Sequence, residues 1–311
     1  MHSAGPRITL RAREAGPVAW RAVRREQAGA LHSIFTRSAY LALGDALVCI
    51  GPHGLGNGAL HLLCEPWPDH VALDALIAPG DSIVGDGSCI RIGALAISLA
   101  DAVAWRPAQE PAWNAETLKR GVDIAVATTR GAPPEGLAPL LGHAARGTAP
   151  LPPIARAASE PAQYLGALAE AATRGRPWRV DSERITPLLG LGPGLTPSGD
   201  DYLAGFLIAL TRLRLLPLRD AIWLAIGPHA AALTNAISCA HLAAAAEGFG
   251  HAALHALIDA ILAGDAASIG GSVRTVTAIG HTSGWDALTG ALAALESCAF
   301  APTPAAADAP R

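Results

Sequence analysis

The chain has 311 residues, 51% of them hydrophobic and 16% charged, and its formal net charge is −3. A chain of this length usually forms two domains or one domain with a large appendage, and it has enough apolar residues for a sizeable core. Without a basic excess, the chain lacks the electrostatic footprint of a protein that binds nucleic acid or an anionic membrane surface.

The cysteines and the apolar stretches indicate a cytoplasmic protein. The five cysteines are scattered and contain no C-x-x-C pair, so neither a disulfide framework nor a zinc knuckle is expected. Arginines at positions 7, 11 and 13 precede no apolar segment of the kind that a secretory signal requires. The longest apolar stretches, such as 202–210, fall well short of the roughly 20 residues that span a membrane.

Residues from about 8 to 105 are predicted to be rich in β-strands. The short apolar runs Ala46–Gly51 and Ala59–Cys64 flank a glycine-rich turn segment, residues 51–58, and the pair is interpreted as a hairpin. The periodicity of Gln27–Leu43 fits a helix or a strand and does not separate the two.

Further strands are expected later in this region. Ser82–Val84 and Ile90–Ser98 are apolar runs on either side of a Gly-Asp-Gly turn at 85–87. The following segment, Leu99–Trp105, is predicted to be an apolar helix or the end of a strand. The sequence leaves the order of these strands open.

From Pro111 onward the chain is rich in alanine and leucine with Gly or Pro punctuation, which is typical of helices. The predicted helices are Trp113–Arg130, Gly136–Ala145, Glu160–Arg174, Asp201–Leu215, Arg219–Ala225, Asn235–Gly248, Ala252–Ala263 and Trp285–Cys298. Gly147–Pro153 is interpreted as a linker. The fold class is therefore α+β, with a β-rich domain over 1–110, a helical domain over 111–300 and a disordered tail over 301–311.

The segment Gly190–Asp201, GLGPGLTPSGDD, is the first candidate site. Its small side chains allow backbone N–H groups to approach a ligand closely. Ser198 is predicted to cap the following helix, with Asp200 and Asp201 in the first turn. A tight, well-capped connection explains this pattern; so does an anion or carboxylate site formed by free N–H groups and the hydroxyls of Thr196 and Ser198.

Two adjacent aspartates repel a bare phosphate, so they fit the second reading only if they also meet a cation, a substrate amide N–H group or a metal ion. The segment is neither a Walker loop nor a dinucleotide fingerprint, because no lysine follows the glycines and their spacing differs. His251 and His255 have an i, i+4 spacing, but no glutamate completes a zinc motif. No cofactor and no metal ligands are predicted, although a divalent cation would suit the aspartates.

The pattern S-G-x-D-x-L-x-G of residues 198–205 recurs at 283–290. The second copy again starts a predicted helix, with its serine placed to cap and Asp286 in the first turn. Gly205 and Gly290 fall inside the helices, where glycine costs about 1 kcal/mol relative to alanine, so a close approach of two helices would explain them. S-G-x-D is a common helix start; the sharper hypothesis is that both helix N-termini point at one ligand.

Two further features lie near these loops. Thr234–Ser238 is interpreted as a third helix start, with Thr234 as the cap and Ser238 bonding either to its own helix or to a ligand. His281 directly precedes the second Ser-Gly pair. It is a candidate general acid or base, and a loop histidine bonded to backbone is the alternative.

With these residues in view, the chain resembles the AllH-type subunit family of oxamate carbamoyltransferase. The motifs that carry the resemblance are Leu31–Arg37, Gly190–Asp201 with Tyr202–Gly205 after it, Thr234–Ser238 and Gly280–Asp286. They span roughly residues 30–295, and GPGLTPSGDD is the most specific of them. The resemblance implies a complex with an acyl-CoA-synthetase-like subunit of the FdrA type and a third subunit type. That complex interconverts oxalurate plus phosphate with oxamate plus carbamoyl phosphate during the breakdown of allantoin, a purine product.

This chemistry suits the polar residues of the two loops and their surroundings. The predicted catalytic residues are Asp200, Asp201, His281 and Asp286. The predicted substrate-binding residues are Gly192, Gly194, Thr196, Ser198, Gly199, Thr234, Ser238, Thr282, Ser283 and Gly284. The aspartates would hold amide nitrogens, the N–H groups and hydroxyls would bind anionic oxygens, and the histidine would move a proton. A non-catalytic ligand-binding or assembly subunit, and a stand-alone enzyme for another amide or ureido acid, are the alternatives.

Overall fold

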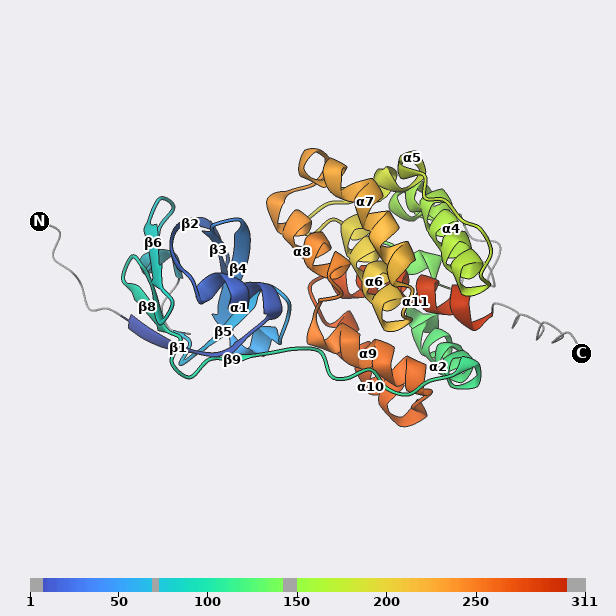
Figure 1. Ribbon diagram of the computed structural model, residues 1–311, viewed down its shortest axis with the longest axis horizontal. Coiled ribbons are helices and arrows are strands. Elements are labelled where there is room, and N and C mark those ends of the chain that lie inside the picture. Colours follow the sequence, from blue (N-terminus) through green and yellow to red (C-terminus); the bar gives the residue numbers. More distant parts are fainter. Residues whose placement is uncertain (1–7, 69–72, 142–149, 301–311) are drawn as a thin grey trace, which may run out of the picture. The chain divides into compact units, whose positions relative to one another are not determined.

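The computed structural model describes residues 8–68, 73–141 and 150–300 (Figure 1). It forms two compact units, Met1–Pro107 and Ala108–Arg311, the first built mainly of strands and the second of helices. The predicted α+β class is confirmed. Within the described ranges, no helix has both the length and the apolar character needed to cross a membrane. The predicted tail, 301–311, lies outside the described residues, as does 147–149 of the predicted linker.

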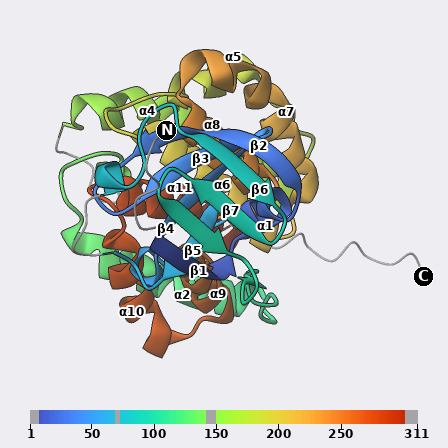
Figure 2. The same ribbon diagram turned by 90° about the vertical axis from the view of Figure 1, so that its left-hand side faces the viewer.

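In the described part of the first unit, the strands form one nine-stranded sheet whose order is β5-β4-β3-β2-β6-β7-β8-β1-β9. Because β1 also pairs with β5, the sheet closes into a barrel. The strands are β1 Ile8–Ala15, β2 Glu26–Ile34, β3 Ala39–Leu43, β4 Ala46–Pro52, β5 His61–Glu65, β6 Ser82–Asp86, β7 Cys89–Ile92, β8 Leu95–Ser98 and β9 Val103–Ala104. Figure 2, which is turned by 90° about the vertical axis from Figure 1, shows several of these strands together with helix α1, Pro17–Val23.

The barrel core follows the period-two alternation of its strands. On β1, Leu10 and Ala12 are fully buried, whereas Thr9 and Arg11, which alternate with them, are exposed. On β6, Ile83 is likewise buried between exposed neighbours. The inward residues of the other strands continue this apolar interior, which explains why the sequence pattern correctly predicted strands here.

The predicted hairpin between the runs at 46–51 and 59–64 is wrong. The corresponding strands, β4 and β5, are parallel, with Cys49 opposite His61. The segment between them contains a 3₁₀ turn, His53–Leu55, and carries the chain back along β4 instead of reversing it directly. The other edge of β5 then pairs antiparallel with β1 and completes the barrel.

The remaining ambiguities of this unit are resolved as strands. Gln27–Leu43 covers most of β2 and all of β3, which pair antiparallel. Ile90–Ser98 is not one strand, because Gly93, with φ of 51°, turns the chain between β7 and β8. The segment Leu99–Trp105 contains β9 and no helix.

The second unit is helical and centres on α6, whose residues Leu203, Phe206 and Leu207 are fully buried. Its helices are α2 Ala115–Thr128, α4 Pro153–Thr173, α5 Ser182–Ile185, α6 Ser198–Arg212, α7 Leu216–Leu233, α8 Ala236–Ala246, α9 Ala252–Ala263, α10 Ala266–Thr277 and α11 Ser283–Ala299. Helix α6 packs against α7, α8, α9 and, most extensively, α11. These neighbours surround α6 in Figure 1.

The predicted helix Gly136–Ala145 is wrong over its described part, which holds only the 3₁₀ turn Ala138–Leu140. The proline and glycine of this segment prevent a regular helix. The other predicted helices are present, and α9 has the predicted bounds. Helix α4 begins earlier than predicted and continues through Pro161. Helix α10 was missed, because its glycines and threonines give it little helix propensity.

Candidate functional site

Helices α6 and α11 cross at two glycines. A Cβ atom built on Gly205 would lie 1.9 Å from the carbonyl oxygen of Ala287, and one built on Gly290 would lie 1.9 Å from that of Tyr202. The two contacts are reciprocal, because each glycine of one repeat meets the equivalent backbone position of the other. The predicted close approach of the helices is therefore confirmed.

The prediction that the two repeated serines cap their helices is wrong. The cap positions are taken by Pro197 before α6 and Thr282 before α11, and neither side chain makes a capping hydrogen bond. At the start of α6 the Pro197 carbonyl accepts from the backbone N–H groups of Asp200 and Asp201, at 3.0 and 3.1 Å. Ser198 and Ser283 are consequently the first helical residues, and their hydroxyls are available to other groups.

The hydroxyl of each of these serines contacts an aspartate of the other helix. The hydroxyls of Ser283 and Thr196 interact with the Asp201 carboxylate, and this interaction partly offsets the rise in the Asp201 pKa that burial causes. In the equivalent way, the Ser198 hydroxyl interacts with the Asp286 carboxylate and partly offsets the rise in the Asp286 pKa that burial causes. Oγ of Ser283 also lies 2.9 Å from Oγ1 of Thr196. The two helix N-termini therefore form one site, in which the serine hydroxyl of each repeat interacts with the aspartate of the other repeat.

Asp200 is held by hydrogen bonds on both of its oxygens. Oδ1 accepts from the N–H of Gly190 at 2.9 Å, and Oδ2 accepts from the hydroxyl of Thr234 at 2.5 Å. Its side chain is buried, and this burial raises the Asp200 pKa, an effect that the hydroxyls of Thr234 and Ser238 partly offset. Asp200 thus fastens the glycine-rich loop and the start of α8 to α6.

Thr234 is not the cap of α8, contrary to the sequence prediction. Asn235 caps the helix, since its Oδ1 accepts from the N–H groups of Ile237 and Ser238, each at 3.0 Å. Its Nδ2 donates to the carbonyl of Leu195 at 2.8 Å and so joins α8 to the glycine-rich loop. The sequence reasoning missed Asn235, although an asparagine just before an apolar run is itself a capping signal.

Asp286 is fully buried and accepts a hydrogen bond from the segment around Leu137, a contact that the sequence analysis did not predict. Its Oδ1 accepts from the N–H of Leu137 at 2.6 Å. A Cβ atom on Gly136, where φ is 56°, would lie 2.4 Å from the same oxygen, so only glycine fits. This contact links residues far apart in the chain, and no local motif signals it.

Burial raises the pKa of all three aspartates, with the largest effect at Asp201. The charges of Asp286 and Asp200 raise the pKa of Asp201 further, so the carboxylates interact. Oδ2 of Asp201 and Oδ2 of Asp286 are both buried and lack a regular hydrogen bond to any described residue. The same holds for Oγ of Ser238. We call Asp200, Asp201 and Asp286 the carboxylate cluster.

His281 lies outside hydrogen-bonding contact with the carboxylate cluster. Its side chain is 84% exposed, and Nε2 lies 3.5 Å from a carboxylate oxygen of Glu135. Thr282 lies beside Asp286, and its hydroxyl partly offsets the rise in the Asp286 pKa that burial causes. The structure therefore brings the three aspartates and the neighbouring hydroxyls together, and it places the histidine at the surface.

The glycines of the candidate site meet steric demands of the backbone. Gly192 and Gly194 have φ values of 112° and 105°, which L side chains rarely adopt. A Cβ atom on Gly199 would lie 2.0 Å from the carbonyl oxygen of Leu188. Gly284 has the equivalent restriction against the end of α10. These glycines shape the two helix starts, and substrate contact by their N–H groups remains a prediction.

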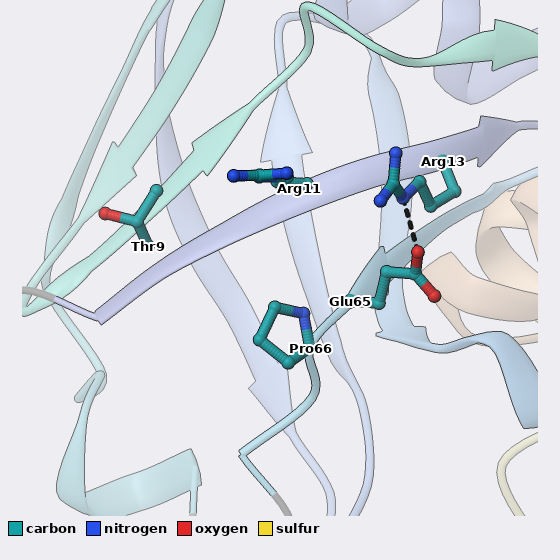
Figure 3. A pocket seen from close by; sticks show the side chains of 5 residues that line it. All are labelled: Thr9, Arg11, Arg13, Glu65 and Pro66. Atoms are coloured by element: carbon teal, nitrogen blue, oxygen red, sulfur yellow. Dashed lines mark hydrogen bonds and ion pairs between the residues drawn. The ribbon is translucent and has the colours of Figure 1, made fainter.

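The first unit contains a pocket of about 430 Å³ lined by Thr9, Arg11, Arg13, Glu65 and Pro66 (Figure 3). Nε of Arg13 donates to Glu65 at 2.5 Å, so one of the two guanidinium groups is already paired. None of the predicted site residues belongs to this pocket. In the described ranges, no three or more His, Cys, Asp or Glu side chains are grouped so that they would hold a metal ion.

Fold and site together define an α+β protein whose helical unit joins two helix N-termini around buried aspartates. Residues 188–295 match the model of a family described as oxamate carbamoyltransferase subunit AllH. The match confirms the resemblance to that family over this segment, which includes both repeats and the whole carboxylate cluster. Comparison with solved structures gives no significant match.

Proposed function

We propose that the chain is a subunit of an oxamate carbamoyltransferase-like complex. The complex interconverts oxalurate plus phosphate with oxamate plus carbamoyl phosphate. The observation that carries this proposal is the crossed arrangement of Ser198 with Asp286 and Ser283 with Asp201, because it lies wholly inside the segment that matches the AllH family. A subunit of an FdrA-like type and a third subunit type would complete the complex.

The reaction makes two demands that this arrangement can meet. As a phosphate oxygen bonds to the carbamoyl carbon, the bond from that carbon to the oxamate nitrogen breaks, and negative charge develops on the carbamoyl oxygen. Hydroxyls at Thr196 and Ser283 and backbone N–H groups of the 192–199 loop would donate to that oxygen and to the substrate carboxylate. The oxygens of Asp201 and Asp286 that lack a hydrogen bond would accept from the substrate's N–H groups. Alternatively, they would bind a cation that balances the negative charge of the substrate.

The departing oxamate nitrogen also needs a proton, for which the chain offers two candidates. Asp201 has the most strongly raised pKa of the cluster, mainly because its carboxylate is buried, so it retains a proton to higher pH than an ordinary aspartate. His281, at the surface beside Glu135, is the second candidate and would act from outside the cluster. Asp200, with both oxygens bonded, would position the loop and would not itself transfer a proton.

The direct experiment measures carbamoyl phosphate formation from oxalurate and phosphate by this chain, first alone and then with both partner subunit types. Asp201→Asn should lower the rate of the reconstituted complex by about 10²–10⁴-fold, the usual loss when a general acid is removed. Asp265→Asn is the matched control, since Asp265 starts α10 at the surface and asparagine caps a helix equally well. An unchanged rate with Asp201→Asn would instead assign the chain a ligand-binding or assembly role.

The substrate class is tested separately by thermal unfolding of the chain with small acids. Oxalurate or oxamate should raise the unfolding temperature, because ligands that bind only the folded state stabilise it. Equal stabilisation by unrelated amide or ureido acids would favour a stand-alone enzyme with a different substrate.

A further inference from the structure

The three carboxylates of the cluster fall into two kinds. Asp200 has a partner for each oxygen, the N–H of Gly190 and the hydroxyl of Thr234. Asp201 and Asp286 each keep one buried oxygen, Oδ2, without a regular hydrogen bond to any described residue. A buried carboxylate oxygen left without a partner is costly. These two oxygens are therefore the atoms at which a positively polarised ligand would be most strongly bound.

The charge around these oxygens is also incomplete. Three ionised aspartates carry three negative charges, and the N-termini of α6, α8 and α11 each supply the equivalent of only about half a positive charge. In the described part of the chain, no arginine or lysine forms an ion pair with Asp200, Asp201 or Asp286. Negative charge thus remains in excess, and protons or a cation must compensate for it.

The donor atoms around the free oxygens indicate which cation fits. Besides the two carboxylates, the neighbours include the hydroxyls of Thr196, Ser198, Thr282 and Ser283, so these side-chain donors are all oxygen. Such a set suits Mg²⁺ or Mn²⁺ and not Zn²⁺ or Cu²⁺. Magnesium is commonly held by one or two carboxylates and completes its shell with water and substrate oxygens, so a cage of three acidic groups is unnecessary.

We propose that Asp201 and Asp286 bind a divalent cation of the magnesium class, and that this cation chelates the substrate. The second half of this inference rests on the proposed function. Oxalurate and oxamate both carry a carboxylate directly attached to an amide carbonyl, and one oxygen from each group closes a five-membered ring around a divalent ion. Cation and substrate would then be held together, and the aspartates would no longer repel an anionic ligand. Because a carboxylate must be ionised to bind a metal ion, Asp201 then serves as a ligand of the cation and not as the proton donor to the departing nitrogen.

The cation site is tested on the full chain without partners, using Mn²⁺ as the probe. After treatment with a chelator and its removal, the chain should bind one Mn²⁺ saturably, as followed by the paramagnetic resonance signal of free Mn²⁺. Asp201→Asn and Asp286→Asn should each weaken binding at least about tenfold, because a carboxylate ligand is lost. The amide oxygen in Asp286→Asn can still accept from the N–H of Leu137, so we expect the fold to be preserved. Asp265→Asn, at the surface start of α10, should leave binding unchanged.

Absence of saturable Mn²⁺ binding by the native chain would overturn the inference. So would binding that Asp201→Asn and Asp286→Asn leave intact, because the ion would then lie elsewhere. Should Asp286→Asn fail to fold, as judged by circular dichroism, Asp201→Asn alone decides between these outcomes.

Chelation of the substrate has its own measurement. Oxamate should tighten Mn²⁺ binding, whereas propionamide, an amide without the adjacent carboxylate, should not. Equal stabilisation of the chain by oxamate with and without a chelator would show that N–H groups satisfy the two oxygens, and would overturn the inference. The proposed function fails separately: Mn²⁺ binding by a chain whose reconstituted complex forms no carbamoyl phosphate refutes the reaction and keeps the site. Full activity of the reconstituted complex in the presence of a chelator would refute the cation site and keep the proposed reaction.

Discussion

Gly205 of α6 packs directly on the backbone of Ala287 in α11, so closely that a Cβ atom would lie 1.9 Å from the Ala287 carbonyl oxygen. Gly290 and Tyr202 make the equivalent contact in the opposite direction. Because both contacts involve backbone, no side-chain movement can relieve an added methyl group. The glycines hold the first turns of the two helices at the spacing on which the crossed serine–aspartate pairs depend.

We expect Gly205→Ala to destabilise the protein by about 1–3 kcal/mol or more, the usual cost of overpacking a tight contact. On helix propensity alone the same change would stabilise by about 1 kcal/mol. Gly270→Ala in α10 is the matched control, since its Cβ would meet only the far end of Arg274, at 3.9 Å. Chemical unfolding followed by the helical circular dichroism signal measures both variants. Equal stability changes for the two would contradict the close crossing.

Thr234 supplies the second prediction, through its hydroxyl bond to the buried Oδ2 of Asp200. Thr234→Val keeps the shape of the side chain and leaves that oxygen without its donor, so we expect a loss of about 1–3 kcal/mol. Thr234→Ser retains the hydroxyl and should stay within about 0.5 kcal/mol of the native chain, as a substitution that breaks no buried interaction usually does. If the valine and serine variants unfold at the same denaturant concentration, Asp200 is not fastened through this bond.

The sequence predicted much of this architecture because most elements carry local signals. Alternating apolar residues identified the strands, and Ala/Leu-rich segments identified the long helices. The parallel pairing of β4 and β5 was missed, because nothing in the 51–58 segment separates a returning crossover from a hairpin turn. Helix α10 was missed because packing, and not local propensity, determines it.

At the candidate site, the repeat of S-G-x-D-x-L-x-G correctly predicted a close approach of two helices at Gly205 and Gly290. The capping roles of Ser198 and Ser283 were wrong, because the first helical turn begins at each serine and the hydroxyl bonds across the crossing. The bond of Leu137 to Asp286 lay beyond sequence reasoning, since it joins distant segments without a motif.

His281 gives the third prediction. Because its imidazole is 84% exposed and its charged neighbour is Glu135, we expect His281→Gln to lower the rate of the reconstituted complex less than about tenfold. Asp201→Asn should lower it far more. Glu135→Gln serves as the control for loss of the surface pair, which should contribute little. A loss of 10²-fold or more with His281→Gln, but not with Glu135→Gln, would make the histidine the proton carrier.

The fourth prediction concerns the pH dependence of stability. Burial raises the pKa of Asp200, Asp201 and Asp286 above the ordinary aspartate value of 3.8 in the folded state. Between the unfolded and the folded pKa the folded chain therefore binds more protons than the unfolded chain. The free energy of unfolding must then fall as pH rises from about 4 toward the raised pKa values. The stabilisation that these three carboxyl groups contribute is fully present only below the ordinary aspartate pKa of 3.8.

Asp201→Asn isolates the largest part of this effect, since an amide does not ionise. With a chelator present throughout, so that no divalent ion stabilises the carboxylates, the variant should gain stability relative to the native chain as pH increases from about 4 to 8. Asp265→Asn should show no such gain, because hydrogen bonds from Ser268 lower the pKa of that exposed aspartate. Chemical unfolding at several pH values measures the difference. A constant difference between Asp201→Asn and the native chain would mean that Asp201 ionises alike in the folded and unfolded states, and that its burial does not govern its charge.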